Sequence, residues 1–149
     1  MIAGLILIPF IIGIASLLLK NISKYLLFAG AVLHALLTVF CWFKQPSPML
    51  GGWLGIDSVG MLFLSITSLL FFVVSIYSLS YLEDESEEEK ADILGVPSKS
   101  LYVACQLFFL SAMTLVITSQ HLVIMWIAIE ATTLASAPLI FFHRNPRSL

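Results

Sequence analysis

The sequence predicts an all-α integral membrane protein, a polytopic bundle of about five transmembrane helices. Of its 149 residues, 60% are hydrophobic and only 11% are charged, whereas a soluble domain is about 45–50% apolar and about 25% charged. Seven of the nine acidic residues lie between Glu83 and Asp92, so the charges are too clustered to cover a soluble core. Five apolar runs are long enough to cross about 30 Å of hydrocarbon.

The apolar runs cover residues 2–19, 25–43, 56–82, 101–119 and 122–142. Because hydrocarbon offers no partner for backbone N–H and C=O groups, each run is expected to form a helix. No positively charged segment precedes the first run, which favours a retained helix over a signal peptide. The chain therefore divides into three helices over residues 1–82, an acidic cytoplasmic loop over 83–100, and two helices with a basic end over 101–149.

The basic residues predict the orientation of the helices. With five spans, one side of the membrane carries six of the seven lysines and arginines, and the other side carries only Lys44. The six are Lys20, Lys24, Lys90, Lys99, Arg144 and Arg147. Since loops rich in Lys and Arg stay in the cytoplasm, we expect a multi-pass protein of the cell inner membrane, with its N-terminus outside and its C-terminus in the cytoplasm.

The segment EDESEEEKAD, between the third and fourth runs, is the one long polar stretch. A run of like charges is typical of a solvated loop, and docking of a cation or a partner is the alternative. The sequence contains no nucleotide-binding glycine loop, zinc motif or calcium-binding loop. Cys41 and Cys105 stand singly within apolar runs, without metal-ligand spacing. We therefore predict no cofactor, no metal site, no catalytic site within this chain and no binding of nucleic acid.

Polar residues inside the spans indicate how the helices pack. A stripe of serines shares one face of the third helix, namely Ser58, Ser65, Ser68 and Ser75. Such small residues favour close helix packing over a proton wire, and Gln106 is expected to bond across to a neighbouring helix. His34 lies ten residues into the second span. Either a structural hydrogen bond to another helix or a part in proton relay would explain it.

Glu130 differs from the other polar residues because it lies eight residues into the fifth helix, about 12 Å along the helix axis. An ionised carboxylate at that depth costs several kcal/mol, on the order of 3 or more, unless it is protonated, hydrated or paired. Trp126, Thr133 and Leu134 share its face, while Ala128 and its small neighbours form a strip that would admit a close helix. The candidate proton-translocation residues are Glu130, His34, Trp126 and Thr133.

The last third of the chain, with the segment HLVIMWIAIEATTLASAPLIFFHRNPRSL, resembles a known family of membrane subunits. A tryptophan four residues before an intramembrane glutamate, here Trp126 and Glu130, is followed by small and hydroxylated residues and a basic end. This pattern is similar to the antiporter-like subunits of respiratory complex I, of energy-converting hydrogenases and of multi-subunit sodium/proton antiporters. The hydrogenase-4 component F type is the most similar, and Asp57, which opens the third helix, fits its N-terminal portion.

The resemblance implies that Glu130 pairs with a lysine on a broken seventh helix, and that this pair gates a proton half-channel built from helices four to eight. The sequence ends at Leu149, near the expected start of a sixth helix. The chain is then a fragment, a split subunit completed by another chain, or a shortened relative.

Two functions follow from the resemblance. One is translocation of protons or sodium ions, as a subunit or part of one, in a redox-driven complex of the hydrogenase or NADH dehydrogenase type. The alternative is a non-transporting scaffold or assembly subunit. In both, the partners are the lipid bilayer and other membrane subunits of the complex.

Overall fold

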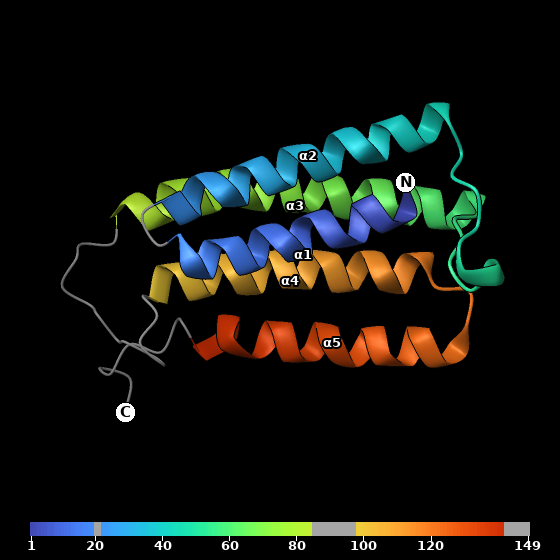
Figure 1. Cartoon of the computed structure of the whole chain (residues 1–149). Coiled ribbons are helices and arrows are strands. Elements are labelled where there is room, and N and C mark those ends of the chain that lie inside the picture. The colour runs from blue at the N-terminus through green and yellow to red at the C-terminus, as the bar shows by residue number, and fades with distance from the viewer. Residues whose placement is uncertain (20–21, 85–97, 142–149) are drawn as a thin grey trace.

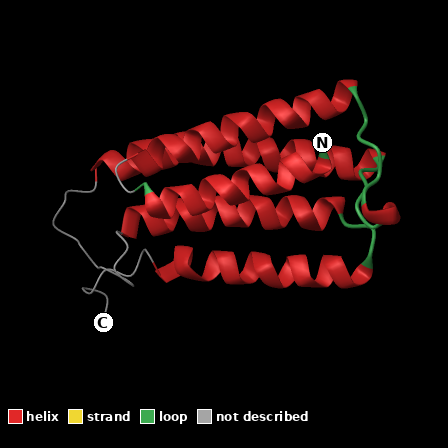
Figure 2. Cartoon of the chain, viewed as in Figure 1, coloured by secondary structure: helices red, strands yellow, loops and turns green. Residues whose placement is uncertain are grey.

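A computed structural model of the chain describes residues 1–19, 22–84 and 98–141 (Figure 1). These residues form five α-helices and one short 3-10 helix, and no strand is assigned among them (Figure 2). The helices are α1 (Ile2–Leu18), α2 (Ser23–Phe43), α3 (Ser58–Asp84), α4 (Ser98–Thr118) and α5 (Leu122–Phe141), with the 3-10 helix η2 at Leu50–Gly52. The all-helical fold predicted from the sequence is confirmed.

Four of the helices are long and apolar enough to cross a membrane, and α1 is a shorter apolar helix of 17 residues. Each helix begins and ends within three residues of the predicted apolar run. The largest shift is at α4, which begins at Ser98 inside the predicted acidic loop. The rest of that loop, residues 85–97, and the basic end beyond residue 141 lie outside the described residues, so the proposed roles of these segments stay predictions.

The helices lie roughly antiparallel, with α4 at the centre of the arrangement and α5 at one edge (Figure 1). Helix α4 packs against α1, α2, α3 and α5, whereas α5 has extensive contact only with α4 in the described part of the chain. As a result, α5 is the least buried of the membrane-length helices. Most of its surface is left for lipid or for another protein segment.

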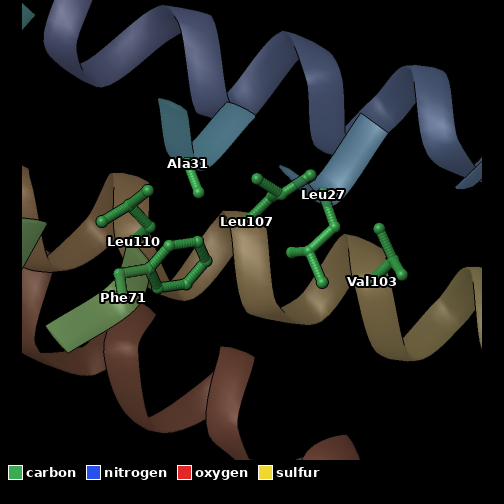
Figure 3. Close-up of a cluster of buried hydrophobic side chains, with 6 residues drawn as sticks. All are labelled: Leu27, Ala31, Phe71, Val103, Leu107 and Leu110. Carbon is green, nitrogen blue, oxygen red and sulfur yellow. The ribbon is translucent and has the colours of Figure 1, made fainter. Parts of the chain in front are cut away.

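The core between α2, α3 and α4 is made of interlocking apolar side chains (Figure 3). Its buried members are Leu27, Ala31, Phe71, Val103, Leu107 and Leu110. Helix α1 reaches α4 at Gly13, where a Cβ atom would stand 2.7 Å from the Phe108 ring. Because membrane helices gain little from apolar burial alone, such close backbone approach is a main source of packing energy.

The loop after α2 returns to the bundle and holds the turn between α4 and α5. The Gly55 N–H donates to the carbonyl of Thr118 and the Gln120 N–H donates to the carbonyl of Trp53, each at 2.8 Å. The Trp53 ring also stacks on His121, with ring centroids 4.6 Å apart. These contacts fix the position at which α5 begins.

Candidate functional site

Glu130 lies in the middle of α5, on the face that points away from α4. Ala128 is fully buried against the bundle, so the small-residue strip does admit a close helix, and that helix is α4. On the opposite side Glu130 and Thr133 are exposed, together with Trp126 and Leu134, which are 71% and 68% exposed. Three of the candidate residues therefore occupy one surface, the Glu130 face, defined here by Trp126, Glu130, Thr133 and Leu134.

Among the described residues, no side chain forms a hydrogen bond or ion pair with the Glu130 carboxylate. The nearby hydroxyl groups are satisfied within α5 itself. Thr133 donates to the carbonyl of Glu130 at 2.7 Å, and Thr132 donates to the carbonyl of Ile129 at 2.6 Å. Like the indole N–H of Trp126, the carboxylate therefore has no hydrogen-bond partner among the described residues.

No group of three or more His, Cys, Asp or Glu side chains is placed to hold a metal ion in the part of the chain that is described. The described lysines stand at helix ends, Lys24 and Lys99 near the starts of α2 and α4 and Lys44 directly after α2. Glu130 is eight residues from the start of α5, about 12 Å along the axis. None of these three lysines is on a mid-helix turn at that depth.

Unlike the exposed and unpartnered carboxylate of Glu130, the His34 side chain is only 1% exposed and both of its ring nitrogens are hydrogen-bonded. Its Nδ1 lies 3.2 Å from Ser68 Oγ on α3, and its Nε2 lies 3.0 Å from Thr114 Oγ1 on α4. The single hydroxyl proton of Thr114 is donated to the carbonyl of Leu110 at 2.8 Å. Thr114 therefore accepts from Nε2–H. When the ring is neutral, Nδ1 accepts from Ser68, and the ring is the Nε2–H tautomer.

The structure does not bring His34 and Glu130 together. His34 joins α2, α3 and α4, whereas Glu130 points away from α4 on the far side of that helix. Of the two explanations for His34, the hydrogen-bonding geometry favours the structural one. A part for His34 in proton relay stays a prediction.

Most of the serine stripe faces the bundle as expected: Ser68 and Ser75 are buried and Ser65 is half-buried, whereas Ser58 is exposed. Ser65 accepts a hydrogen bond from Trp42 Nε1 at 2.9 Å, and Ser75 is fully buried. Gln106 bonds across to α3, where its Nε2 lies 3.3 Å from Ser78 Oγ. Sequence reasoning missed Ser78 as this partner, although Ser78 follows Ser75 by three residues and so continues the same helix face.

Comparison with known proteins gives one informative similarity. No family model matches the chain, and no solved structure matches it. The hydrogenase-4 component F homolog of Methylacidiphilum infernorum (isolate V4) is 30% identical over 152 residues. The alignment covers 99% of this chain and 30% of the relative, so the chain spans less than a third of the relative's length. This similarity supports the resemblance indicated by the sequence: the chain is a multi-pass membrane protein that is similar, over nearly its whole length, to a hydrogenase-4 component F homolog.

Proposed function

We propose that this chain is a proton- or cation-translocating antiporter-like subunit, or part of one, in a redox-driven membrane complex of the hydrogenase type. The observation that carries the proposal is the Glu130 carboxylate, placed at mid-helix on an uncovered face of α5. Of its neighbours on that face, Leu134 is apolar, Thr133 is hydrogen-bonded within the helix, and Trp126 offers only an indole N–H donor. Titration of this carboxyl group is the one proton chemistry that the face offers.

The surroundings of Glu130 support a second membrane element on this face. An ionised carboxylate facing lipid at mid-span costs several kcal/mol, on the order of 3 or more. A cation or a water-filled path beside the carboxylate removes most of that cost. We infer that a helix outside the described residues, or in another subunit, brings the cationic partner that the resemblance implies.

A non-transporting scaffold is the second candidate, and the exposed apolar side chains around Glu130 favour it. Trp126, Ile127 and Leu134 make a broad surface on which another subunit could pack. In that case Glu130 would only hydrogen-bond across the interface. The two candidates differ in whether Glu130 must titrate, since an amide can replace a hydrogen-bonding carboxyl group but cannot carry a proton.

The experiment is Glu130→Gln in the complete complex, with ion translocation and redox activity measured side by side and assembly checked on a native gel. Glutamine keeps the volume and the hydrogen-bonding capacity of the side chain, so we expect normal assembly. We expect coupled ion movement to be lost or strongly reduced, because the titratable proton is gone.

Asp57→Asn is the matched control, since it makes the same carboxylate-to-amide change outside the candidate site. Asp57 Oδ1 accepts from the Gly60 N–H at 2.7 Å and caps α3. Asparagine caps helices about as well as aspartate, so this variant should pump normally. Wild-type pumping by an assembled Glu130→Gln complex would defeat the transport proposal and leave the scaffold.

A further inference from the structure

A groove of about 260 Å³ runs between α2 and α3, away from the Glu130 face. Ala35, Thr38 and Trp42 line it from α2, and Ser68, Leu69 and Phe72 line it from α3. The three α2 residues belong to the carboxyl-terminal half of that helix, which tilts away from the rest of the bundle (Figure 1). The divergence of the two helices leaves space that the small side chains of Ala35 and Ser68 do not fill.

The polar groups that line the groove are already satisfied inside the protein. Thr38 donates to the carbonyl of His34 at 2.9 Å, and Ser68 is the hydrogen-bond partner of His34 Nδ1. The Trp42 indole N–H donates to Ser65 at 2.9 Å, and the Ser65 hydroxyl in turn donates to a backbone carbonyl one turn earlier. A polar occupant would have to give up hydrogen bonds to water without finding a donor here, which is unfavourable. The groove therefore selects for an apolar, uncharged occupant.

The size and position of the groove narrow further the class of apolar molecule that it can hold. The volume of the groove is below the roughly 300–1,000 Å³ of pockets that hold drug-sized ligands. Both flanking helices are long and apolar enough to span a membrane. At the rim, Val39 and Leu69 are exposed and apolar. The medium at this depth of a bilayer is hydrocarbon.

We propose that the groove between α2 and α3 binds a hydrocarbon chain of a membrane lipid. The chain lies against Leu69 and Phe72 and covers Ser68, the α3 partner of the buried His34. Water that reached Ser68 could compete for its bond to His34. A bound chain excludes that water and keeps the contact between α2 and α3 dry. This binding does not depend on whether Glu130 carries protons.

The test uses the complete complex reconstituted in phosphatidylethanolamine vesicles that contain a small fraction of the same lipid with a diazirine in its acyl chain. After photolysis, labelled residues are mapped by mass spectrometry. We expect labelling to concentrate at the groove residues Val39, Leu69 and Phe72. Even labelling of all lipid-facing residues on α2 and α3, or no label in the groove of the assembled complex, would overturn the proposal.

Two matched substitutions on α2 sharpen the test. Ala35→Phe fills the groove and should lower labelling of Leu69 and Phe72 by at least about fivefold, because the apolar contact area is occupied by the new ring. Ala29→Phe makes the same change at an exposed position outside the groove and should leave labelling unchanged. Equal labelling in both assembled variants would also overturn the proposal. The wild-type labelling pattern decides the matter on its own where Ala35→Phe does not assemble.

Discussion

Replacing His34 with leucine tests whether the hydrogen bonds of this buried histidine stabilise the packing of α2 against α3 and α4. The imidazole forms hydrogen bonds to Ser68 on α3, at 3.2 Å, and to Thr114 on α4, at 3.0 Å. His34→Leu removes both hydrogen bonds and puts an apolar side chain of similar size in place of the imidazole. Interhelical hydrogen bonds in membranes contribute on average about 0.6 and at most about 1.7 kcal/mol each. Two such bonds predict a loss of about 1–3 kcal/mol in the free energy of unfolding.

The structure favours the lower half of that range. Thr114 already donates to the carbonyl of Leu110, so its hydroxyl keeps one bond in the variant. Ser68 loses its acceptor but can turn to a carbonyl of its own helix, as Ser65 does toward Met61. Both hydroxyls can thus keep a hydrogen bond in the variant. Leaving a buried polar group unpaired is the larger part of the cost of breaking a buried hydrogen bond. We expect a loss of about 1–2 kcal/mol.

A double-mutant cycle isolates the bond between α2 and α3. Unfolding of the purified chain is measured in mixed detergent micelles for His34→Leu, Ser68→Ala and the pair. We expect a coupling energy of about 0.5–1.5 kcal/mol, because residues in direct contact are not additive. Ser75→Ala is the control, since Ser75 is equally buried on α3 but donates to the carbonyl of Phe72. A coupling energy of zero between His34 and Ser68 would refute the assigned bond and the tautomer derived from it.

The remaining predictions concern the packing of α1 and the orientation of the bundle. Gly13→Val should destabilise the bundle by about 1–3 kcal/mol, the usual cost of overpacking, because its Cβ would stand 2.7 Å from Phe108. Gly4→Val, whose Cβ would meet nothing closer than 3.8 Å, should cost clearly less, and equal losses would contradict this packing. The orientation is tested with single substitutions and an impermeant thiol reagent. The reagent should modify Lys44→Cys from the outer face and Lys90→Cys from the inner face. Labelling of position 90 from outside would reverse the proposed topology.

The sequence predicted the helices well because their length is dictated by the bilayer, and it predicted poorly how they are arranged. Leu64 is fully buried while Leu69, five residues later on the same helix, is 65% exposed. Both positions are leucine because lipid and protein core are equally apolar, so hydrophobic periodicity carries no information about which face is inside. Polar residues carry part of that information: Ser68 and Gln106 mark the inner face, whereas Glu130 lies on the outer face of α5. The central place of α4 could not be predicted from residues of this kind.

The sequence also could not predict which helices surround each residue of the candidate site. The sequence singled out both His34 and Glu130 as ionisable groups within spans, because polar residues in membrane helices are costly wherever they point. Their different situations depend on the partners that tertiary packing supplies. His34 finds Ser68 and Thr114, which lie 34 and 80 residues away along the chain, whereas Glu130 finds no partner among the described residues. Sequence spacing within one helix does not encode such distant pairings.

The composition of the Glu130 face indicates what would specify a partner there. Covering Trp126, Ile127 and Leu134 with another apolar helix replaces lipid by side chains of similar polarity, so the transfer itself contributes little. Satisfying the Glu130 carboxylate removes a desolvation cost that lipid cannot relieve. A partner on this face would therefore be selected by a polar or cationic group that meets Glu130, and apolar fit would only adjust the packing around that group. A helix that lacked such a group would gain little by binding α5.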